Sequence, residues 1–496
     1  MKTDSLLHAF LICFALGLID ATAAAPASRP PNIILFVADD HGQDAGCYGN
    51  KIIQTPNLDR LAGEGTRYTR AFCTTASCSA SRSVILSGLH NHANGQFGHQ
   101  HSFHHFYTYN SVKSLPVILA ENGYRIGRIG KFHVQPEEVY KFQTILGGNP
   151  GGARNPVGMA ERCREFVSRT DAPFFLYFCT ADPHRSGDRR EDNPHQPDAF
   201  GNGRRYEGVQ ETAYDSKQIR VPPWLPDTPE SRAELAEYYQ SVSRVDQGLG
   251  RLIEVLKQSG EYDRTILIYT SDNGAAFPGS KTTLYEPGMR LPLVVRNPFA
   301  TKRGLVSDAM VSWVDLTPTI LDFAGIKEVL APPLVAGNPE VAAPRKQPAT
   351  RYAFHGRSFA ATLEQEKPGG WNEVFASHTF HEITMYYPMR VIRTERYKLI
   401  LNLAHPLPFP FASDLFDSTT WQAALKSGRG VYGQRRIGDF IQRPRYELYD
   451  LETDPHEIRN LADKPEAQAV FKELSEKLKA FQQRTRDPWI VKYEYE

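Results

Sequence analysis

The sequence predicts an α/β fold in which helices cover both faces of a mostly parallel central sheet, followed by a smaller α+β unit. Between residues 32 and 323, short apolar segments typical of buried strands alternate with segments of helical spacing. Polar residues follow several of these strands at the point where each one ends. After about residue 371, the pattern changes to that of antiparallel strands and a closing amphipathic helix.

The predicted elements are as follows, in chain order. Buried strands are expected at 32–38, 124–129, 173–179, 265–270 and 291–295. Helices are expected at 58–62, 83–89, 115–121, 161–169, 233–257 and 315–323. A Pro- and Ala-rich loop is expected at 327–350, strands at 396–401 and 446–449, and a final helix at 467–482. We therefore place a catalytic domain at residues 26–370 and an α+β subdomain with an antiparallel sheet at 371–496.

The composition and the charge of the chain are ordinary. It has 496 residues, of which 41% are hydrophobic and 23% charged, as in a typical globular protein. The formal net charge is only +1. Charge therefore gives no reason to expect a nucleic acid partner, and a site for an anion must be built locally.

The first 25 residues have the pattern of a secretory signal peptide. Lys2 supplies a positive charge, residues 6–19 are apolar, and residues 21–25 offer small side chains for cleavage. No later segment has the apolar length that a membrane span requires. Five cysteines follow, too few for a disulfide framework, and the chain has no Asn-x-Ser/Thr acceptor. The sequence therefore favours an exported bacterial protein, periplasmic or secreted, over a lysosomal one.

Polar residues collect at four strand ends. Because ligands of open parallel sheets bind beyond the carboxyl ends of the strands, these residues are expected to converge on one site. They are Asp39 and Asp40, Lys131 and His133, Asp182 to Arg185, and Asp272 and Asn273. Asp39, Asp40, Asp272 and Asn273 carry hard oxygen donors, which suit Ca²⁺, Mg²⁺ less well and zinc poorly. Such residues in isolation are usually turns and caps, but their shared position favours a metal site.

Cys78 opens a predicted helix. A helix N-terminus stabilises anions and lowers the pKa of a thiol. Two other interpretations exist: an inert buried cysteine, or a thiol nucleophile paired with a histidine, which the spacing does not exclude. The predicted hard-cation site suits chemistry on an oxyanion better than acyl transfer by a thiol.

The segment from Cys78 to Arg82, followed by residues 83–88, resembles the signature of the type I sulfatases. In that family the Cys of C-x-P-x-R is oxidised to formylglycine. Asp39-Asp40 and residues 130–133, 271–274, 447–451 and 454–457 resemble further motifs of the family, so the resemblance covers nearly the whole mature chain. Ala80 stands where most members have Pro. The resemblance implies an alkaline-phosphatase-like three-layer sandwich and conversion of Cys78 by a maturation enzyme.

Within the family, the chain resembles the sulfamidases, which are N-sulfoglucosamine sulfohydrolases of heparan sulfate breakdown. This likeness lies at residues 98–106, 181–185, 277–279 and 381–390. It implies release of sulfate from terminal N-sulfoglucosamine, a sulfated saccharide as partner, and the possibility of a homodimer. The alternatives are an O-sulfatase acting on another sulfated glycan, a phosphate-ester hydrolase of the same fold, and a non-catalytic glycan-binding pseudo-sulfatase.

The resemblance also implies roles for single residues. One Ca²⁺ per subunit would be held by the acidic and amide residues at the strand ends and by the modified cysteine, that is by Asp39, Asp40, Cys78, Asp272 and Asn273. Arg82 and Lys131 would hold the formylglycine and the sulfate, and Lys281 would hold the sulfate from the other side, where sulfamidases have Arg. His184 would be the acid for the leaving group and His133 the base for the second hydroxyl. The candidate substrate contacts are Asp182, Arg185, His381 and Glu382.

A histidine-rich run extends from His90 to His105. It has neither a helical zinc motif with Glu nor paired cysteines. We therefore expect it to form a loop at the rim of the pocket rather than a metal site.

Overall fold

The computed structural model describes residues 29–186, 189–190, 193–197, 200–332, 334 and 349–495. The expected signal peptide at 1–25 and residues 335–348 of the expected loop lie outside the described residues. Among the described helices, none combines the length and the apolar character that a membrane span requires.

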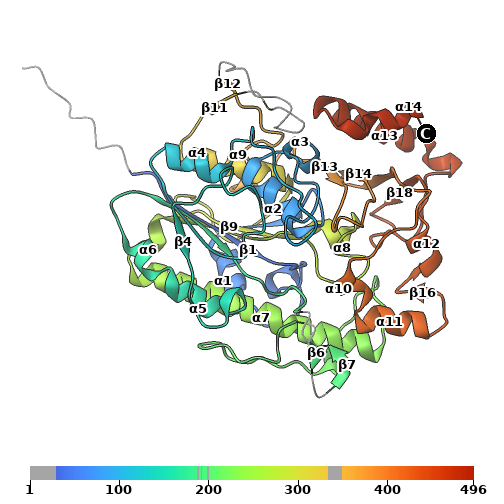
Figure 1. The fold of residues 1–496 in the computed structure, drawn as a ribbon, viewed down its shortest axis with the longest axis horizontal. Helices are drawn as coiled ribbons and strands as arrows, with labels where there is room; N and C mark the ends of the chain where they lie inside the picture. Colours follow the sequence, from blue (N-terminus) through green and yellow to red (C-terminus); the bar gives the residue numbers. More distant parts are fainter. Residues whose placement is uncertain are drawn as a thin grey trace, which may run out of the picture.

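The centre of the protein is an eight-stranded sheet (Figure 1), with the strand order β10-β2-β9-β8-β1-β5-β3-β4. β1 lies between β5 and β8 and is parallel to both. All seven residues of β1 are buried, because both faces of the sheet are covered. The bounds are β1 Asn32–Ala38, β2 Thr66–Phe72, β3 Arg125–Gly130, β4 Thr144–Leu146, β5 Phe174–Cys179, β8 Thr265–Ser271, β9 Arg290–Arg296 and β10 Leu305–Ser312.

Helices cover the two faces of this sheet, so the fold is the predicted three-layer sandwich (Figure 1). Alternate residues of β1 point to opposite faces: Ile33 packs in one hydrophobic cluster and Ile34 in the other. One face is covered by α2 Cys78–Ser87, α3 Asn91–Asn94, α4 Leu115–Glu121 and α9 Leu316–Phe323. The other is covered by α1 Pro56–Glu64, α5 Pro156–Arg162, α6 Arg164–Ser168 and α7 Pro229–Gln258.

The sheet is mostly, but not entirely, parallel. β9, which was expected as a buried strand, pairs antiparallel with both β8 and β2. β2 and β10 were not predicted. The reason is visible in β2, whose sequence TRYTRAF has neither a regular alternation of polar and apolar residues nor the continuous apolar run of a central strand.

α2 begins at Cys78, the residue expected to open a helix, and thus five residues before Ser83, where the helical pattern of residues 83–89 starts. The first turn, Cys-Ser-Ala-Ser, contains few strong helix formers, and all ten residues of the helix are buried. Burial on every side, rather than an amphipathic pattern, therefore stabilises this helix. Its N-terminus points Cys78 toward the carboxyl end of the sheet, where Sγ lies 3.5 Å from Asp40 Oδ1.

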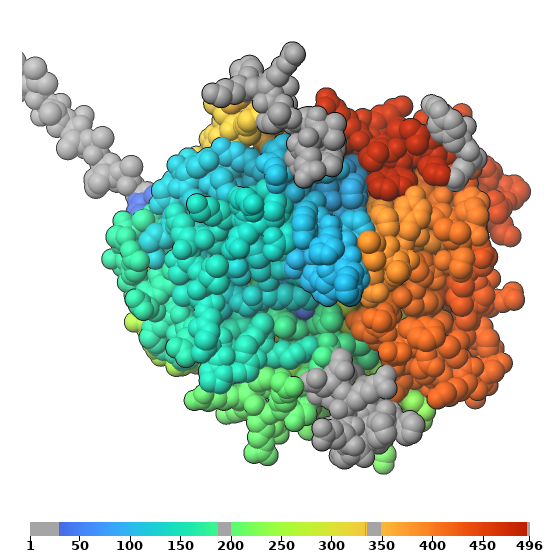
Figure 2. Space-filling view, in the orientation of Figure 1, coloured from blue at the N-terminus to red at the C-terminus, as the bar shows by residue number. Residues whose placement is uncertain are grey.

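The C-terminal unit contains the predicted antiparallel sheet, with strands β13 Glu373–His378, β14 Met389–Thr394, β15 Tyr397–Asn402 and β18 Tyr446–Asp450. α13 Gln468–Arg484 packs on it through Leu474, Leu478 and Phe481. Figure 2 shows this unit, in orange and red, packed side by side against the larger sandwich. α10 Ser413–Phe416 and α11 Thr419–Lys426 extend from it, and α11 contacts α7.

The remaining elements are short. They are α8 Glu286–Met289, α12 Ile437–Ile441, α14 Lys492–Tyr495, β6 Arg189–Arg190, β7 Asn193–Pro197, β11 Leu330–Ala331, β12 Thr350–Arg351, β16 Val431–Tyr432 and β17 Arg435–Arg436.

Candidate active site

The ends of β1, β3, β5 and β8 meet at one edge of the sheet, as the parallel pairing requires. Asp39 follows β1, and its carboxylate oxygens accept from Lys131 Nζ at 2.5 Å and from Arg82 Nη2 at 3.3 Å. Asp272 follows β8, and its Oδ2 accepts from Arg82 Nε at 2.8 Å. The structure therefore brings together the polar residues that the sequence placed at separate strand ends.

The four predicted metal ligands form one buried cluster. The backbone N–H of Asp40 donates to Asp272 Oδ1 at 3.0 Å, and Asn273 Nδ2 donates to Asp40 Oδ1 at 2.7 Å. The carbonyl oxygen Asn273 Oδ1 is buried and has no hydrogen-bond partner among the described residues. A buried acceptor normally has a partner, and the carboxylate of Asp40 lies beside this side chain. This donor set fits a hard divalent cation.

Electrostatics in the cluster support the same conclusion. Burial acts to raise the pKa of Asp39, but the charges of Lys131 and Arg82 outweigh it and hold that pKa well below its usual range. Burial raises the pKa of Asp272, and the nearby carboxylates of Asp39 and Asp40 add to the shift despite Arg82. A divalent cation among these carboxylates would relieve their mutual repulsion.

Cys78 is the first residue of α2 and is fully buried. The helix N-terminus was expected to lower the pKa of its thiol. The opposite holds, because burial raises this pKa well above its usual range, and Asp40 and Asp39 add to the effect against Lys131. An unmodified Cys78 is therefore a protonated thiol at neutral pH, which is a poor nucleophile.

Arg82 and Lys131 connect the cysteine to the acidic cluster. Arg82 is fully buried and bridges Asp39 and Asp272. Its Nη1 also donates to the backbone carbonyl of Lys131 at 3.0 Å, which fixes the turn after β3. Asp39 raises the pKa of Lys131 against the effect of burial, so the lysine stays charged.

Lys281 lies at the opposite side of the cluster and is 1% exposed. Its Nζ donates to Asp40 Oδ2 at 3.0 Å, to His184 Nε2 at 3.0 Å and to Asp414 Oδ2 at 2.9 Å. The other ring nitrogen of His184 lies 2.6 Å from the backbone carbonyl of Arg185. Burial and the charge of Lys281 lower the pKa of His184. The ring is therefore neutral, with Nδ1 protonated and Nε2 accepting from the lysine.

His133 lies after β3, on the histidine-rich side of the site. Its Nε2 lies 2.7 Å from His101 Nδ1, and its Nδ1 is buried without a partner among the described residues. Burial, Lys131 and the neighbouring rings hold the pKa of His133 well below its usual range. The ring is therefore neutral and able to accept a proton.

Asp182 and Arg185, two predicted substrate contacts, are engaged by the protein itself. Asp182 is fully buried between Arg154 at 2.5 Å and Arg244 at 2.7 Å. Arg185 makes a bidentate pair with Glu234, at 3.0 and 3.1 Å. These contacts favour a positioning role over direct contact with a substrate.

The other two predicted substrate contacts, His381 and Glu382, lie in different surroundings from each other. His381 is buried next to the nucleophile position, with Nδ1 2.9 Å from Ser77 Oγ and Nε2 3.0 Å from His99 Nε2. Glu382 is partly exposed, and its carboxylate accepts from Ser413 Oγ at 3.3 Å. Glu382 thus lies on the solvent side of the site, where a substrate could reach it.

Sequence reasoning missed several residues of the site. Asp414, on α10 of the C-terminal unit, pairs with Lys281, and its side chain is 21% exposed. His99 connects His381 to Ser79 Oγ, and Glu234 of α7 holds Arg185. No local motif marks these residues, because each comes from a different element. Only the histidine-rich run gave a signal for His99.

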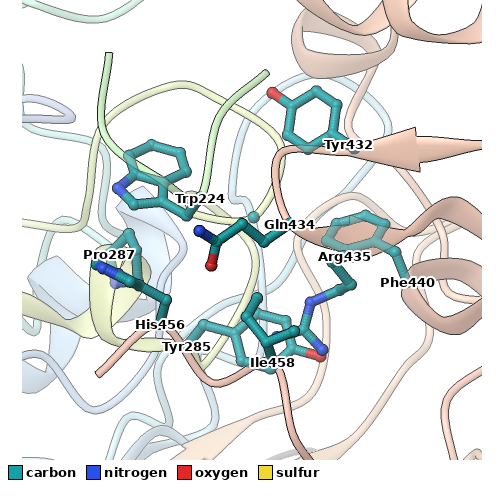
Figure 3. Close-up of a pocket in the computed structure, with 10 residues that line it drawn as sticks. Trp224, Tyr285, Pro287, Tyr432, Gln434, Arg435, Phe440, His456 and Ile458 are labelled. Atoms are coloured by element: carbon teal, nitrogen blue, oxygen red, sulfur yellow. The ribbon is translucent and has the colours of Figure 1, made fainter. Parts of the chain in front are cut away.

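A small pocket lies between the loop that carries Lys281 and the C-terminal unit (Figure 3). Its lining is largely aromatic, and the guanidinium of Arg435 lies 4.1 Å from the ring centre of Tyr285. The lining residues are Trp224, Gly279, Tyr285, Pro287, Tyr432, Gln434, Arg435, Phe440, His456 and Ile458. None of the candidate site residues lines this pocket, so the chemistry belongs to the strand ends instead.

Comparison with known families assigns this arrangement to a class. The family described as Sulfatase matches residues 31–326, and the chain belongs to the sulfatase family. It is therefore a hydrolase that releases sulfate. The family described as N-sulphoglucosamine sulphohydrolase, C-terminal, matches residues 279–407.

Among curated proteins, human N-sulphoglucosamine sulphohydrolase is 38% identical to this chain over 96% of the chain and 94% of the human protein. An ulvan-active sulfatase of Formosa agariphila is 28% identical over 91% and 79%. The resemblance to sulfamidases that the sequence motifs indicated is confirmed across nearly the whole length.

Solved structures show the same fold. A structure in complex with its substrate D-glucosamine-2-N,6-O-disulfate has a TM-score of 0.63 at 24% identity, covering 92% of this chain and 99% of that one. A phosphonate monoester hydrolase of Agrobacterium radiobacter has a TM-score of 0.61 at 19% identity, covering 92% and 96%. The sandwich alone therefore does not select sulfate over phosphorus esters.

Proposed function

We propose that the protein releases sulfate from the amino group of a terminal N-sulfoglucosamine of heparan-type glycans. The observation that carries this proposal is the similarity to human N-sulphoglucosamine sulphohydrolase over nearly the whole of both chains. The geometry supports it, because three cations, Arg82, Lys131 and Lys281, flank Cys78 and suit a small tetrahedral anion.

Cys78 is proposed to be converted to formylglycine by a maturation enzyme. The hydrated aldehyde would supply one hydroxyl that attacks sulfur as the amine leaves, and a second hydroxyl whose deprotonation would expel the sulfate from the first oxygen and reform the aldehyde. The raised pKa of the buried thiol supports this modification, because the unmodified side chain would not be an anion. Ala80, in place of the usual Pro, lies inside the buried helix α2.

Asp39, Asp40, Asp272 and Asn273 are proposed to hold one Ca²⁺ per subunit, together with the modified residue at position 78. The ion supplies positive charge that offsets the charge on the sulfuryl oxygens. The unpartnered Asn273 Oδ1 and the crowded carboxylates support this ligand set.

His184 and Lys281 are proposed to handle the proton of the leaving group. The ammonium of Lys281 donates to His184 Nε2, so the pair shares one proton beside Asp40. Passing this proton to the substrate nitrogen would let glucosamine leave as an amine. Across the site, neutral His133 would accept a proton from the second hydroxyl at position 78 when the sulfate is expelled.

Substrate contacts are proposed for His381 and Glu382, with Glu382 facing solvent. Asp182 and Arg185 are proposed to act indirectly. The backbone carbonyl of Asp182 accepts a hydrogen bond from the backbone N–H of Asp39 at 3.0 Å. Arg185 Nε donates to the backbone carbonyl of Ala276 at 2.8 Å. Both therefore support loops that carry site residues.

The organisation of the chain remains as proposed from the sequence. Residues 1–25 are proposed to be a signal peptide, 26–370 the catalytic domain and 371–496 the C-terminal subdomain. We propose an exported protein, periplasmic or secreted in a bacterium, with a homodimer as a possible assembly.

The test is sulfate release from defined monosaccharides by protein that carries the modification. The proposal predicts release from N-sulfoglucosamine and little from glucosamine 6-sulfate, and no release by the Cys78→Ala variant with an unchanged circular dichroism spectrum. Preference for the O-sulfated sugar would support an O-sulfatase instead. Faster turnover of an aryl phosphate than of an aryl sulfate would contradict a sulfatase mechanism at this site.

A further inference from the structure

Three histidines from two separate segments of the chain converge beside the acidic cluster. His99 and His101 belong to the loop before α4, and His133 follows β3. One ring nitrogen from each lies within 4.8 Å of the others. The ring centres are 4.9 Å apart for His99 and His101, 4.9 Å for His99 and His133, and 4.7 Å for His101 and His133.

These distances are close to those of a three-histidine metal site. Zinc binds histidine nitrogens at about 2.0–2.1 Å in tetrahedral geometry, which separates two ligand nitrogens by roughly 3.3 Å. His133 Nε2 and His101 Nδ1 are 2.7 Å apart, so these two rings would move apart by a few tenths of an ångström. His101 is exposed and can make this adjustment.

The ring nitrogens of this cluster differ in their surroundings. His133 Nδ1 is buried and has no partner among the described residues. The proposed metal would bind the nitrogens that face each other, His133 Nε2 and His101 Nδ1, and would replace the hydrogen bond between them, whereas Nδ1 stays outside the site. Burial lowers the pKa of His99, His101 and His133, and neighbouring charged groups add to the effect. The rings are therefore neutral at pH 7, which is the form that binds metal.

We propose that His99, His101 and His133 form a second metal site, which takes a borderline cation such as Zn²⁺ and inhibits turnover when it is filled. Ring nitrogens suit Zn²⁺, whereas the neighbouring carboxylates and the amide of Asn273 suit Ca²⁺. The two sites thus select their ions by ligand chemistry. A metal on His133 removes the proposed base for the second hydroxyl, and this inhibition, unlike the binding, depends on the proposed function.

The cations of the active site limit the affinity of the three histidines for Zn²⁺. Lys131 lies close enough to lower the pKa of all three rings. Lys131 is itself paired with Asp39, which reduces its repulsion of a bound metal. We therefore expect a reversible site, weaker than a structural zinc site with thiolate ligands.

The experiment is calorimetric titration of Zn²⁺ into the full protein in excess Ca²⁺, so that the oxygen site is filled. His101→Ala removes one ligand, and His105→Ala is the matched control, because His105 is an exposed histidine of the same loop that lies near Tyr107 rather than in the triad. We expect one Zn²⁺ per chain in the wild type, an affinity at least about tenfold weaker in His101→Ala, and no change in His105→Ala.

Cys78 could also attract zinc, because its sulfur lies close to Asp39 and Asp272 and to Asp40 and His184. The titration is therefore repeated in a Cys78→Ala background, where the proposal predicts the same affinity. Co²⁺ gives a second readout: three imidazoles predict a visible d–d band without thiolate charge transfer. Absence of zinc binding, binding that His101→Ala leaves unchanged, or binding lost with Cys78 would each overturn the proposal.

Binding and turnover are separable in this design. If N-sulfoglucosamine is not a substrate but zinc still binds through His101, the proposed function fails and the metal site stands. If turnover occurs as proposed, added Zn²⁺ should inhibit the wild type and His105→Ala alike, and inhibit His101→Ala at higher concentration. Equal inhibition of all three proteins would place the inhibitory zinc elsewhere.

Discussion

Arg82 shows how single residues determine the geometry of the site. Its planar guanidinium reaches Asp272, Asp39 and the carbonyl of Lys131 at once, and no part of it is exposed. A lysine carries the same charge but concentrates it on one ammonium group, so it could hydrogen-bond to only some of these three acceptors.

Arg82→Lys should therefore lower kcat by at least about 100-fold, because Asp39 and Asp272 lose their fixed separation. The free energy of unfolding should fall by about 3 kcal/mol, since a buried ion pair loses part of its geometry. Arg70→Lys is the control, because Arg70 pairs with the exposed Glu395 at the surface. Comparable losses for the two variants, in turnover assays and urea titrations, would argue against the special role of Arg82.

Removal of the metal tests whether the acidic cluster holds a cation. Chelation should abolish turnover and lower the melting temperature, because the carboxylates of Asp39, Asp40 and Asp272 would repel one another without a cation. Ca²⁺ should restore both properties. The measurement is thermal unfolding and turnover before and after chelation, with Asp308→Asn as a variant outside the cluster. Full activity after exhaustive chelation would contradict the metal assignment.

The sequence could predict Asp39, Asp40, Asp272 and Asn273, because each lies directly after a buried strand and strand ends converge. It could not predict that burial would outweigh the helix N-terminus at Cys78. That balance depends on how completely α2 is enclosed, which no local pattern reports. Nor could the sequence predict that His133 Nδ1 has no partner among the described residues, because this depends on how the chain packs around the ring.

Elements of the C-terminal unit complete the site. α10 is only four residues long, yet it brings Asp414 to 2.9 Å from Lys281. Burial acts to raise the pKa of Asp414, but the charge of Lys281 and its hydrogen bond outweigh it and lower the pKa to about 2. The carboxylate is therefore ionised and holds Lys281 between itself and Asp40.

Asp414→Asn should lower kcat by about tenfold, because a weaker charge-assisted bond leaves Lys281 less firmly held against His184. KM should change less, and the acidic limb of the pH–kcat profile should shift, since Lys281 and His184 share the proton for the leaving group. Asp439→Asn, an exposed acid of α12, is the control. A change in KM alone would instead indicate direct contact between Asp414 and the sugar.

Strands and helices were predicted correctly where the pattern of apolar residues along the chain is regular. β1, β5, β8 and α7 were expected within a few residues, because they are continuously apolar or clearly amphipathic. α10 had no such signal, because a four-residue helix carries no period.

At the scale of the whole molecule, a layer of buried histidines lies between the two units. His92 of α3 is buried against Phe481 of the C-terminal unit, the half-buried His355 lies beside His92, and His378 of β13 belongs to the C-terminal unit, where its carbonyl accepts from Arg390. Burial lowers their pKa values to about 3, 4 and 3, with added effects of Arg390, Arg443 and Arg484. Asp487, which is paired with Arg390, opposes the shift at His92.

The protein should lose stability as pH falls below about 6.5, the pKa of unfolded histidine. In that range the unfolded chain takes up protons that the folded chain excludes, so each ring costs about 1.4 kcal/mol per pH unit down to its folded pKa. Urea denaturation at pH 7, 6 and 5 measures the slope. His92→Asn, which keeps a polar atom near Ser377, should reduce it, whereas the exposed control His105→Asn should not. Stability independent of pH between 7 and 5 would contradict the buried neutral rings.

An antiparallel sheet in the C-terminal part was predictable from the change of pattern after about residue 371, and a four-stranded antiparallel sheet is present there. The contacts between the units were not predictable. Lys281 pairs with Asp414 across 133 positions of the chain, and sequence spacing carries no information about such a pair.

The central claim is that Cys78 is the precursor of the nucleophile in a sulfatase that acts on N-sulfoglucosamine. Mass spectrometry of the peptide covering residues 71–82, from protein of its native source, tests it most directly. The account predicts a peptide in which the Cys78 thiol has been replaced by an aldehyde, which reacts with a carbonyl-specific hydrazine. A peptide that carries only the unmodified thiol, from protein that is active on N-sulfoglucosamine, would contradict it.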